Sequence, residues 1–312
     1  MEGLVIKNTG SWYMVRQQQG VEPLACKIKG NLRLKGIRAT NPVAVGDVVT
    51  VEVKPDGSAV IAGIKPRRNY IIRRASNLSK EYQIIASNLD QAVLVVTLTN
   101  PVTSTTFIDR FLATAEAYRV PTVIAINKID LLTAHEDREL LDAVSYLYKS
   151  IGYPVIPMST ITCEGIDELR QLLDGKTSLL SGNSGVGKSS IINRLVPDAL
   201  LRVGGVSETH HKGMHTTTFS EMIDLLGGGA IIDTPGVKSF GTIDFERSEV
   251  AHYFREIFAA GANCRYGDCT HTHEPGCAVL QAVEESRISQ SRYASYLSIL
   301  GEDPNDKYRK PQ

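Results

Sequence analysis

The N-terminal part of the chain alternates short hydrophobic stretches with glycine and proline. Runs of this kind, rich in β-branched residues and bounded by turn formers, are typical of strands in small all-β domains. Their number and spacing over residues 1–72 fit a five-stranded OB-type barrel. The strand-like stretches include residues 4–6, 12–15, 47–53 and 59–61.

After about residue 75 the pattern changes to strands that alternate with helices. Residues 92–96 form a continuous apolar run, as expected of a strand buried on both faces of a parallel sheet. Such alternation predicts a parallel sheet flanked by helices, to which we assign residues 73–240. The other expected elements are strands at 122–126 and 155–158 and helices at about 107–118 and 136–151.

The chain turns helical from about residue 241. A cysteine-rich segment interrupts this part, and a polar tail at 301–312 follows it. The length of 312 residues is enough for two or three domains. We therefore expect three domains, with limits at 1–72, 73–240 and 241–312.

Charge is balanced over the whole chain but not along it. With 34 basic and 34 acidic residues, the overall charge favours no class of partner. The first 75 residues, however, hold 13 basic and five acidic residues. A basic β-barrel attracts the phosphate backbone of a nucleic acid, so we expect RNA binding there. The alternative is a solvated, charged surface on a spacer domain.

The start of the chain lacks the charged and apolar regions of a signal peptide, and no apolar run approaches the roughly 18 residues of a membrane span. We expect a soluble, cytoplasmic protein without a membrane partner. Three of the five cysteines lie close together, with histidines among them. Without a secretion signal, this clustering favours a metal site over disulfides.

A glycine-rich loop at 182–189 carries the clearest chemical signal. It stands between a strand-like stretch at 177–180 and helical spacing at 190–195. A helix N-terminus offers unpaired N–H groups to a phosphate, and glycines let the backbone approach it closely. We expect Lys188 to reach the β- and γ-phosphates and to support catalysis, and Ser189 to bind Mg²⁺. The assigned phosphate-binding residues are Ser181, Gly182, Asn183, Ser184, Gly185, Val186, Gly187, Lys188 and Ser189.

A second motif, Asn127, Lys128, Ile129 and Asp130, follows another expected strand. Ligands of open α/β sheets bind at the carboxyl ends of the strands. A carboxylate at Asp130 would accept the ring N–H and the exocyclic amine of guanine, a donor pair that adenine lacks. The Lys128 stem would pack on the base. Together with the glycine-rich loop, this motif predicts a GTP site.

The turn after the next strand belongs to the same expected site. Ser159 and Thr160 follow the strand-like residues 155–158. We expect a backbone N–H of this turn to reach the guanine O6. Taken alone, a plain strand-to-helix turn would have the same sequence pattern.

Two further motifs follow the glycine-rich loop. Asp233 and Gly236 belong to an Asp-Thr-Pro-Gly sequence at the end of a strand. We expect Asp233 to hold Mg²⁺ through water and the Gly236 N–H to sense the γ-phosphate. A run of threonines, 216–218, is expected to close over both; we assign Thr217, although the sequence does not select among the three. The alternative for this run is the start of a β-strand.

One position departs from Ras-like enzymes. There a glutamine just after the switch glycine orients the attacking water, whereas this chain has Val237. Another group or a partner therefore has to position the water. His215 is the candidate, because it stands beside the threonines and an imidazole can act as a base. Its neighbours His210 and His211 are equally well explained as solvent-exposed loop residues.

The segment 264–277 offers three thiols and two imidazoles within 14 positions. Structural zinc takes four such ligands in tetrahedral geometry. Cys264, Cys269, Cys277 and one histidine would fill a closed site, so a structural zinc is expected. His271 and His273 both qualify as the fourth ligand. The alternative is a loop with free, reduced thiols.

In this combination of motifs the chain resembles the bacterial ribosome small-subunit-dependent GTPase A family, the YjeQ/YloQ type. The resemblance covers essentially the whole chain and includes the rotated order, in which 127–130 precedes 182–189. It implies late assembly of the small (30S) ribosomal subunit, contact with its 16S rRNA, and slow GTP hydrolysis that the subunit stimulates. It also favours His271 as the fourth zinc ligand. Thr160 departs from the small residue usual at its position, which a backbone contact tolerates.

The predicted fold class is α/β. A central, circularly permuted P-loop GTPase domain follows an OB-type barrel and precedes a helical zinc-binding module. We expect a monomer that binds GTP and GDP, Mg²⁺ with the nucleotide, and one structural zinc. An alternative function is a nucleotide-gated rRNA-binding module in which hydrolysis is incidental. A small-molecule kinase is a third class, against which Asp130 argues.

Overall fold

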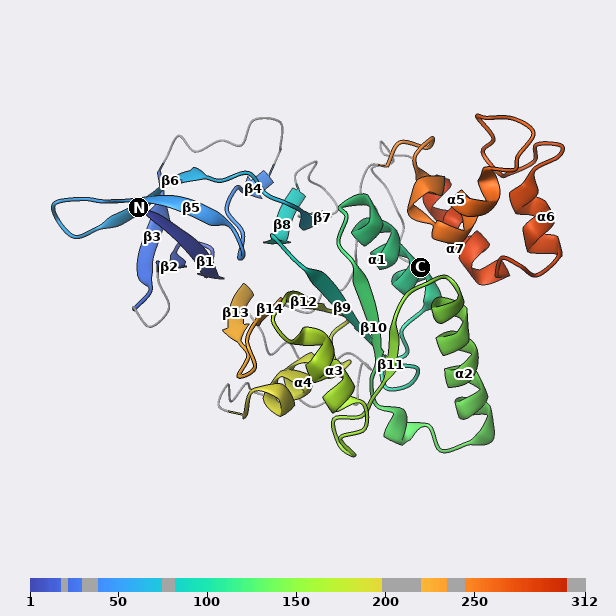
Figure 1. Cartoon of the computed structure of the whole chain (residues 1–312), viewed down its shortest axis with the longest axis horizontal. Coiled ribbons are helices and arrows are strands. Elements are labelled where there is room, and N and C mark those ends of the chain that lie inside the picture. Colours follow the sequence, from blue (N-terminus) through green and yellow to red (C-terminus); the bar gives the residue numbers. More distant parts are fainter. Residues whose placement is uncertain (18–21, 30–38, 75–81, 198–219, 235–244, 302–312) are drawn as a thin grey trace.

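The computed structural model describes residues 1–17, 22–29, 39–74, 82–197, 220–234 and 245–301. Three parts follow one another along the chain: a β-barrel, a mixed sheet with helices, and a group of short helices (Figure 1). The α/β fold class with a barrel before it is confirmed. Among the described residues, every helix is too short or too polar to cross a membrane.

The N-terminal part is a closed five-stranded barrel. Its strands run in the order β1–β2–β3–β6–β5, and β5 pairs back with β1. All neighbours are antiparallel except β3 and β6. Buried side chains such as Val5, Val15 and Ile61 fill the interior, because alternate residues of each strand point inward. The strands are β1 (Glu2–Asn8), β2 (Tyr13–Arg16), β3 (Leu24–Ile28), β5 (Val48–Val53) and β6 (Ala59–Ile64).

A small three-stranded sheet links the barrel to the rest of the chain. It consists of β4 (Ala39–Asn41), β8 (Tyr82–Ser87) and β7 (Tyr70–Arg74) in that order. Nearby, the buried Asp47 carboxylate accepts two hydrogen bonds from Arg67, both 2.6 Å long. The predicted domain limit between residues 72 and 73 falls inside β7. The exact limits of the three domains stay a prediction.

The central part is a six-stranded sheet in the order β11–β10–β9–β12–β14–β13. Five strands are parallel, and β13 is antiparallel to β14. The strands are β9 (Gln91–Val96), β10 (Thr122–Ile126), β11 (Val155–Pro157), β12 (Thr177–Ser181), β13 (Ser220–Asp224) and β14 (Ala230–Asp233).

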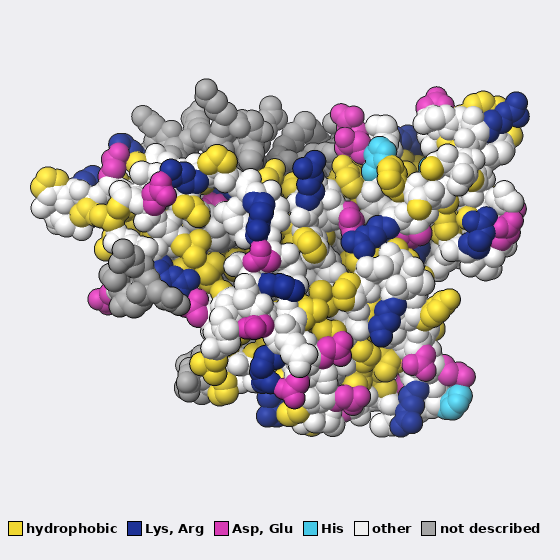
Figure 2. Space-filling model, in the orientation of Figure 1, with side chains coloured by type: hydrophobic (Ala, Val, Ile, Leu, Met, Phe, Trp, Pro, Cys, Tyr) yellow, Lys and Arg dark blue, Asp and Glu magenta, His cyan; other side chains and the backbone are white. Residues whose placement is uncertain are grey.

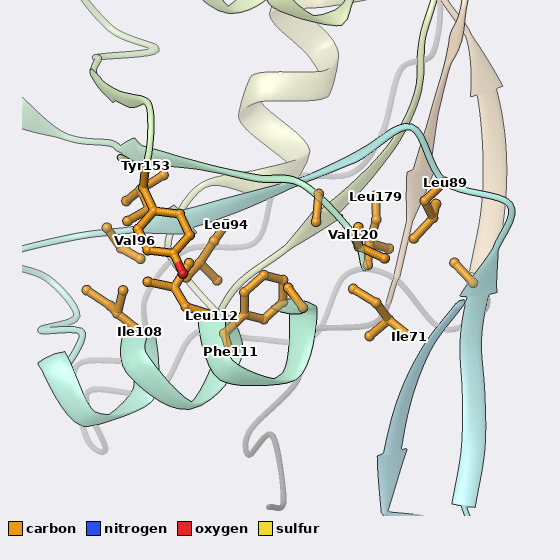
Figure 3. Close-up of a cluster of buried hydrophobic side chains, with 14 of the residues drawn as sticks. Ile71, Leu89, Leu94, Val96, Ile108, Phe111, Leu112, Val120, Tyr153 and Leu179 are labelled. Atoms are coloured by element: carbon orange, nitrogen blue, oxygen red, sulfur yellow. The ribbon is translucent and has the colours of Figure 1, made fainter. Parts of the chain in front are cut away.

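Helices cover both faces of this sheet, which explains why β9 is apolar from residue 92 to residue 96. Leu94 and Val96 pack against Phe111 and Leu112 of α1 (Thr105–Ala117) (Figure 3). The alternate residues Val93 and Val95 lie in a second core on the other face. In a strand buried on both faces, polar residues do not alternate with apolar ones. The other helices are α2 (His135–Ser150) on the first face and α3 (Ile166–Leu173) and α4 (Lys188–Leu195) on the second.

The barrel and the central sheet are joined edge to edge. Strand β13 pairs antiparallel with β1, and Lys7 lies opposite Glu221. The Lys7 ammonium is 2.9 Å from the Glu221 carboxylate, and Arg16 pairs with Asp224. Figure 1 shows β13 below the barrel, next to β14. Strands of both parts therefore form one continuous sheet.

Short helices form the C-terminal part. They enclose a core that includes Phe254, Ile257 and Tyr296, and this core also takes in Ala113 of α1. Below it, Arg292 is buried between Asp109 of α1, at 2.8 Å, and Glu256, at 2.6 Å. The elements are η3 (Val250–Tyr253), α5 (Arg255–Gly261), α6 (Ala278–Glu284) and α7 (Gln290–Leu300).

Candidate functional site

The glycine-rich loop connects β12 to α4 at the carboxyl end of the parallel sheet. Gly182 and Gly187 have positive φ angles of 148° and 100°. A Cβ at Gly182 would stand 2.3 Å from the Val95 carbonyl oxygen, and one at Gly187 would stand 2.3 Å from the Asn127 amide nitrogen. Both positions therefore require glycine, which brings the loop against the strand ends beside it.

Lys188 opens α4 and lies inside the curve of the loop. Its ammonium donates to the carbonyls of Gly182, at 2.8 Å, and Asn183, at 2.9 Å. Burial lowers the pKa of Lys188 to about 8, while the charge of Asp233 acts in the opposite direction. A buried cation that donates to two neutral carbonyls is well placed to bind an anion such as a phosphate.

Asn127 joins the predicted guanine motif to the glycine-rich loop. Its side-chain amide donates to the Val186 carbonyl at 2.8 Å, and its backbone N–H donates to Val96 at 2.8 Å. The side chain is only 1% exposed. Within the described part of the chain, nothing donates to its buried Oδ1. The two predicted motifs are joined by a contact between residues 59 positions apart in sequence and therefore form one site.

Asp130 is oriented by the turn after β11. The hydroxyl of the buried Ser159 donates to Asp130 Oδ1. The same hydroxyl oxygen accepts the backbone N–H groups of Ile161 and Thr162, each at 3.1 Å. Ser159 is thus fixed in one orientation, which holds one oxygen of the Asp130 carboxylate beside the predicted guanine-reading turn.

Sequence reasoning missed Arg194. It lies on α4, and its Nε donates to the Thr160 carbonyl at 2.9 Å. Helix α4, which starts at the glycine-rich loop, therefore also supports the predicted guanine turn. A lone arginine on a helix gives no sequence signal for this contact, because it depends on how α4 packs beside the turn.

Two oxygen donors suited to Mg²⁺ are Asp233, at the end of β14, and Ser189, in the first turn of α4. Asp233 ends β14 and is 2% exposed, and its register partner in β12 is Leu180. Ser189 follows Lys188 in the first turn of α4. Carboxylate and hydroxyl oxygens are the donors that Mg²⁺ prefers, so this donor set fits the ion. The other predicted residues of this part, His215, Thr216, Thr217, Thr218, Gly236 and Val237, lie outside the described residues.

The C-terminal cluster brings together three thiols and one imidazole. The Sγ atoms of Cys264 and Cys277 each lie 3.5 Å from His271 Nδ1. With Cys269, the four ligand atoms lie within 4.8 Å of one another, so this group could hold a metal ion. His273 is not among the four; its Nδ1 contacts the Thr272 hydroxyl at 2.8 Å.

Supporting contacts orient the segment around this cluster. Tyr293 donates to the His271 carbonyl and Tyr296 to the Thr270 carbonyl, both at 2.7 Å. The Glu274 carboxylate accepts from the backbone N–H groups of Thr270 and Thr272. Three thiols and an imidazole in a closed, partly buried group fit a tetrahedral zinc ion.

The barrel surface is less uniformly basic than its sequence. Lys7, Arg16, Lys29 and Lys65 pair with carboxylates. Between β6 and β7, the buried Arg67 and the exposed Arg68 pair with carboxylates as well. Figure 2 shows basic and acidic side chains interspersed over one face of the barrel. Lys27 lies over the Trp12 ring, with its ammonium 4.6 Å from the centroid. Arg33, Lys35 and Arg38 lie outside the described residues.

Two family models match the chain. The RsgA N-terminal domain matches residues 2–61, and the RsgA GTPase matches residues 64–243. A small ribosomal subunit biogenesis GTPase RsgA of Porphyromonas gingivalis is 62% identical over 314 residues, covering 99% of each chain. The protein of that name from Bacteroides fragilis is 58% identical over 311 residues, with the same coverage.

Two solved structures are similar to this chain over nearly its whole length. YjeQ from Thermotoga maritima has a TM-score of 0.74 and 33% identity, covering 97% of this chain and 99% of that one. YloQ, described as a circularly permuted GTPase, has a TM-score of 0.70 and 30% identity, covering 99% and 96%. The rotated motif order, the barrel, the joined nucleotide motifs and these matches lead to one conclusion: the chain belongs to the RsgA GTPase family.

Proposed function

We propose that this protein hydrolyses GTP during a late step in assembly of the small (30S) ribosomal subunit, which stimulates its activity. The observation that carries the proposal is the Asn127 amide donating to the Val186 carbonyl. This contact joins a guanine-selecting motif to a phosphate-binding loop. The relatives from P. gingivalis and B. fragilis carry the name small ribosomal subunit biogenesis GTPase, which supports the same partner.

In this proposal each motif has one task. Asp130 selects guanine by accepting its two N–H donors, and the turn at Ser159 and Thr160 offers a backbone N–H to O6. The loop 182–187 cradles the phosphates, and Lys188 neutralises the charge that develops on them. Ser189 and Asp233 would hold Mg²⁺, which supplies charge stabilisation at the β- and γ-phosphates.

The water-activating step needs a group other than glutamine, because Val237 stands after the switch glycine. We assign that task to His215, and the closure over Mg²⁺ and the γ-phosphate to Thr217 with the Gly236 N–H. This assignment rests on the sequence motifs. A His215→Ala variant is expected to bind GTP normally and to lose most of its subunit-stimulated turnover.

The other two parts take supporting tasks. The barrel would contact 16S rRNA through its basic residues, and a zinc ion held by Cys264, Cys269, His271 and Cys277 would stabilise the C-terminal helices. The protein would act as a cytoplasmic monomer on the subunit. Family membership favours this function over an rRNA-binding module in which hydrolysis is incidental.

Phosphate release from GTP tests the proposal. The protein is assayed alone and with purified small subunits, large subunits or free rRNA, and Lys188→Ala serves as the inactive control. We expect small subunits to raise the rate at least tenfold and the other additions to have little effect. Equal stimulation by large subunits, or none by small ones, would exclude the proposed partner.

A further inference from the structure

A short turn beside the guanine motif has no task in the mechanism above. It spans residues 97–103 between β9 and α1. Strands β9 and β10 are parallel, with Val96 paired to Ile126. The segments that follow them, the turn and the guanine motif, therefore emerge side by side at the carboxyl edge of the sheet.

Hydrogen bonds of two buried threonines close the turn. The Thr103 N–H donates to the Thr97 carbonyl at 2.8 Å, and the Thr97 N–H donates to the Thr103 hydroxyl at 3.1 Å. The Thr97 hydroxyl donates to the Pro101 carbonyl. Thr97 and Thr103 are 0% and 5% exposed. These contacts fix the backbone between the two threonines, including Asn100.

The turn uses this fixed backbone to hold Lys128. The Lys128 ammonium donates to the Asn100 carbonyl oxygen. Asn100 and Lys128 both have positive φ angles, of 42° and 65°. This left-handed backbone conformation is uncommon for residues other than glycine. Burial lowers the pKa of Lys128, while Asp130 opposes that shift. The Lys128 ammonium is thus anchored at Asn100. Lys128 itself stands two positions before Asp130, the proposed guanine-reading carboxylate.

We propose that the turn 97–103 is a positioning element of the guanine site. Its Asn100 carbonyl holds the Lys128 ammonium, so that the methylene stem lies ready to pack on a guanine base. A free lysine side chain has many rotamers to lose on binding, and a side chain held in advance loses fewer. Thr97 and Thr103 act through Lys128. This inference rests on the proposed GTP function.

The first test is a series of threonine variants assayed for GDP affinity with a fluorescent GDP analogue. Thr103→Val removes the hydroxyl that accepts the Thr97 N–H, and we expect affinity to fall about three- to tenfold. Thr103→Ser keeps the hydroxyl and should restore affinity. Thr114→Val is the matched control: Thr114 is 2% exposed in α1, and its hydroxyl donates to the Arg110 carbonyl at 2.8 Å. It should bind GDP like the wild type.

The second test is a double-mutant cycle with Lys128→Met, which keeps an apolar stem but removes the ammonium. In that background Thr103→Val should cost no further affinity, because the turn has nothing left to hold. In the hydrolysis assay, the single variant Thr103→Val should have a higher KM for GTP than the wild type and a nearly unchanged kcat. An equal loss in both backgrounds would overturn the inference, as would wild-type affinity of Thr103→Val.

Two outcomes keep this inference separate from the proposed function. If the wild type binds no GDP, the guanine site itself is wrong. If the wild type binds GDP and the cycle is additive, only the role of the turn is wrong. Should Thr103→Val fail to fold, Thr97→Val removes the other hydroxyl contact, to Pro101, and Thr97→Ser is its rescue.

Discussion

At the scale of single residues, the site depends on a few side chains whose neighbours fix their orientation. Asp130 is one of them, because the Ser159 hydroxyl holds one of its oxygens. A carboxylate accepts two N–H donors, whereas an asparagine amide offers one acceptor and one donor. The nucleotide preference should therefore change with this single residue.

Replacing Asp130 with Asn should exchange guanine for xanthine. Xanthine carries a carbonyl where guanine has its exocyclic amine, and that carbonyl can accept from the new amide. We expect GTP affinity to fall at least 100-fold and XTP affinity to rise above that of the wild type, measured by competition with fluorescent nucleotides. Unchanged GTP affinity would mean that Asp130 does not contact the base.

Lys188 predicts a pH dependence of nucleotide binding. Its pKa of about 8 lies below the ordinary value of 10.5, because burial disfavours the charge. In the free protein, the cost of burying the charged ammonium reduces the free energy of unfolding in full below about pH 8. This cost disappears as the pH rises towards 10.5. A bound phosphate restores the charge, so binding near pH 8.5 should take up most of one proton.

Calorimetry of GDP binding in buffers of different ionisation enthalpy measures this uptake. Above about pH 8 the affinity should also fall, by at most about tenfold per pH unit. Binding heats near pH 8.5 that do not depend on the buffer would show that Lys188 keeps its proton in the free protein.

At the scale of elements, most of the fold could be predicted from the sequence. Strands β9 and β10 and helices α1 and α2 lie where the apolar pattern indicates, because each has a continuous or periodic buried face. The pairing of β13 with β1 could not be predicted. It depends on contacts such as Lys7 with Glu221, 214 positions apart, and no local pattern encodes them.

The candidate site follows the same rule. The motifs indicated Asn127, Asp130 and the glycine-rich loop, because nucleotide chemistry restricts residue types at fixed spacing. The packing contacts of Arg194 and of the turn 97–103 needed the structure. In the metal cluster, both histidines satisfied the sequence, and only the backbone path brings His271 beside the cysteines.

The cluster predicts one zinc per chain in the purified protein. Cys269→Ala removes one of four ligands, and three ligands do not complete a closed tetrahedral site. We expect zinc content, measured by mass spectrometry of the metal, to fall from about one to near zero per chain. Cys163→Ala is the control, since Cys163 is exposed and outside the cluster. Retention of zinc by the Cys269 variant would exclude this ligand set.

At the scale of the whole molecule, the three parts are tied together by polar contacts at their borders. The barrel is joined through β1 and β13, and the C-terminal helices are joined through Arg292. This arginine is 1% exposed and bridges Asp109 of α1 to Glu256 of α5, while Tyr148 of α2 also donates to Asp109. Burial raises the pKa of Asp109, and Arg292 opposes the shift.

Arg292→Met should therefore destabilise the protein strongly. It leaves the Asp109 carboxylate buried without its cation, which costs about 3–5 kcal/mol of unfolding free energy. Arg287→Met is the matched control, because the Arg287–Glu285 pair is exposed and should contribute less than about 1 kcal/mol. Urea unfolding compares the two, and similar midpoints would show that the buried contact does not stabilise the C-terminal part.

The most direct test of the central claim, a GTP site whose hydrolysis depends on the small subunit, uses the exchanged specificity. XTP limits the signal from any contaminating GTPase that selects guanine through a carboxylate, because xanthine lacks the exocyclic amine. Phosphate release from XTP by the Asp130→Asn variant is measured with small subunits and with large subunits. We predict stimulation by small subunits alone. An XTP-binding variant that small subunits fail to stimulate, while they stimulate GTP hydrolysis by the wild type, would contradict the claim that this site performs the reaction.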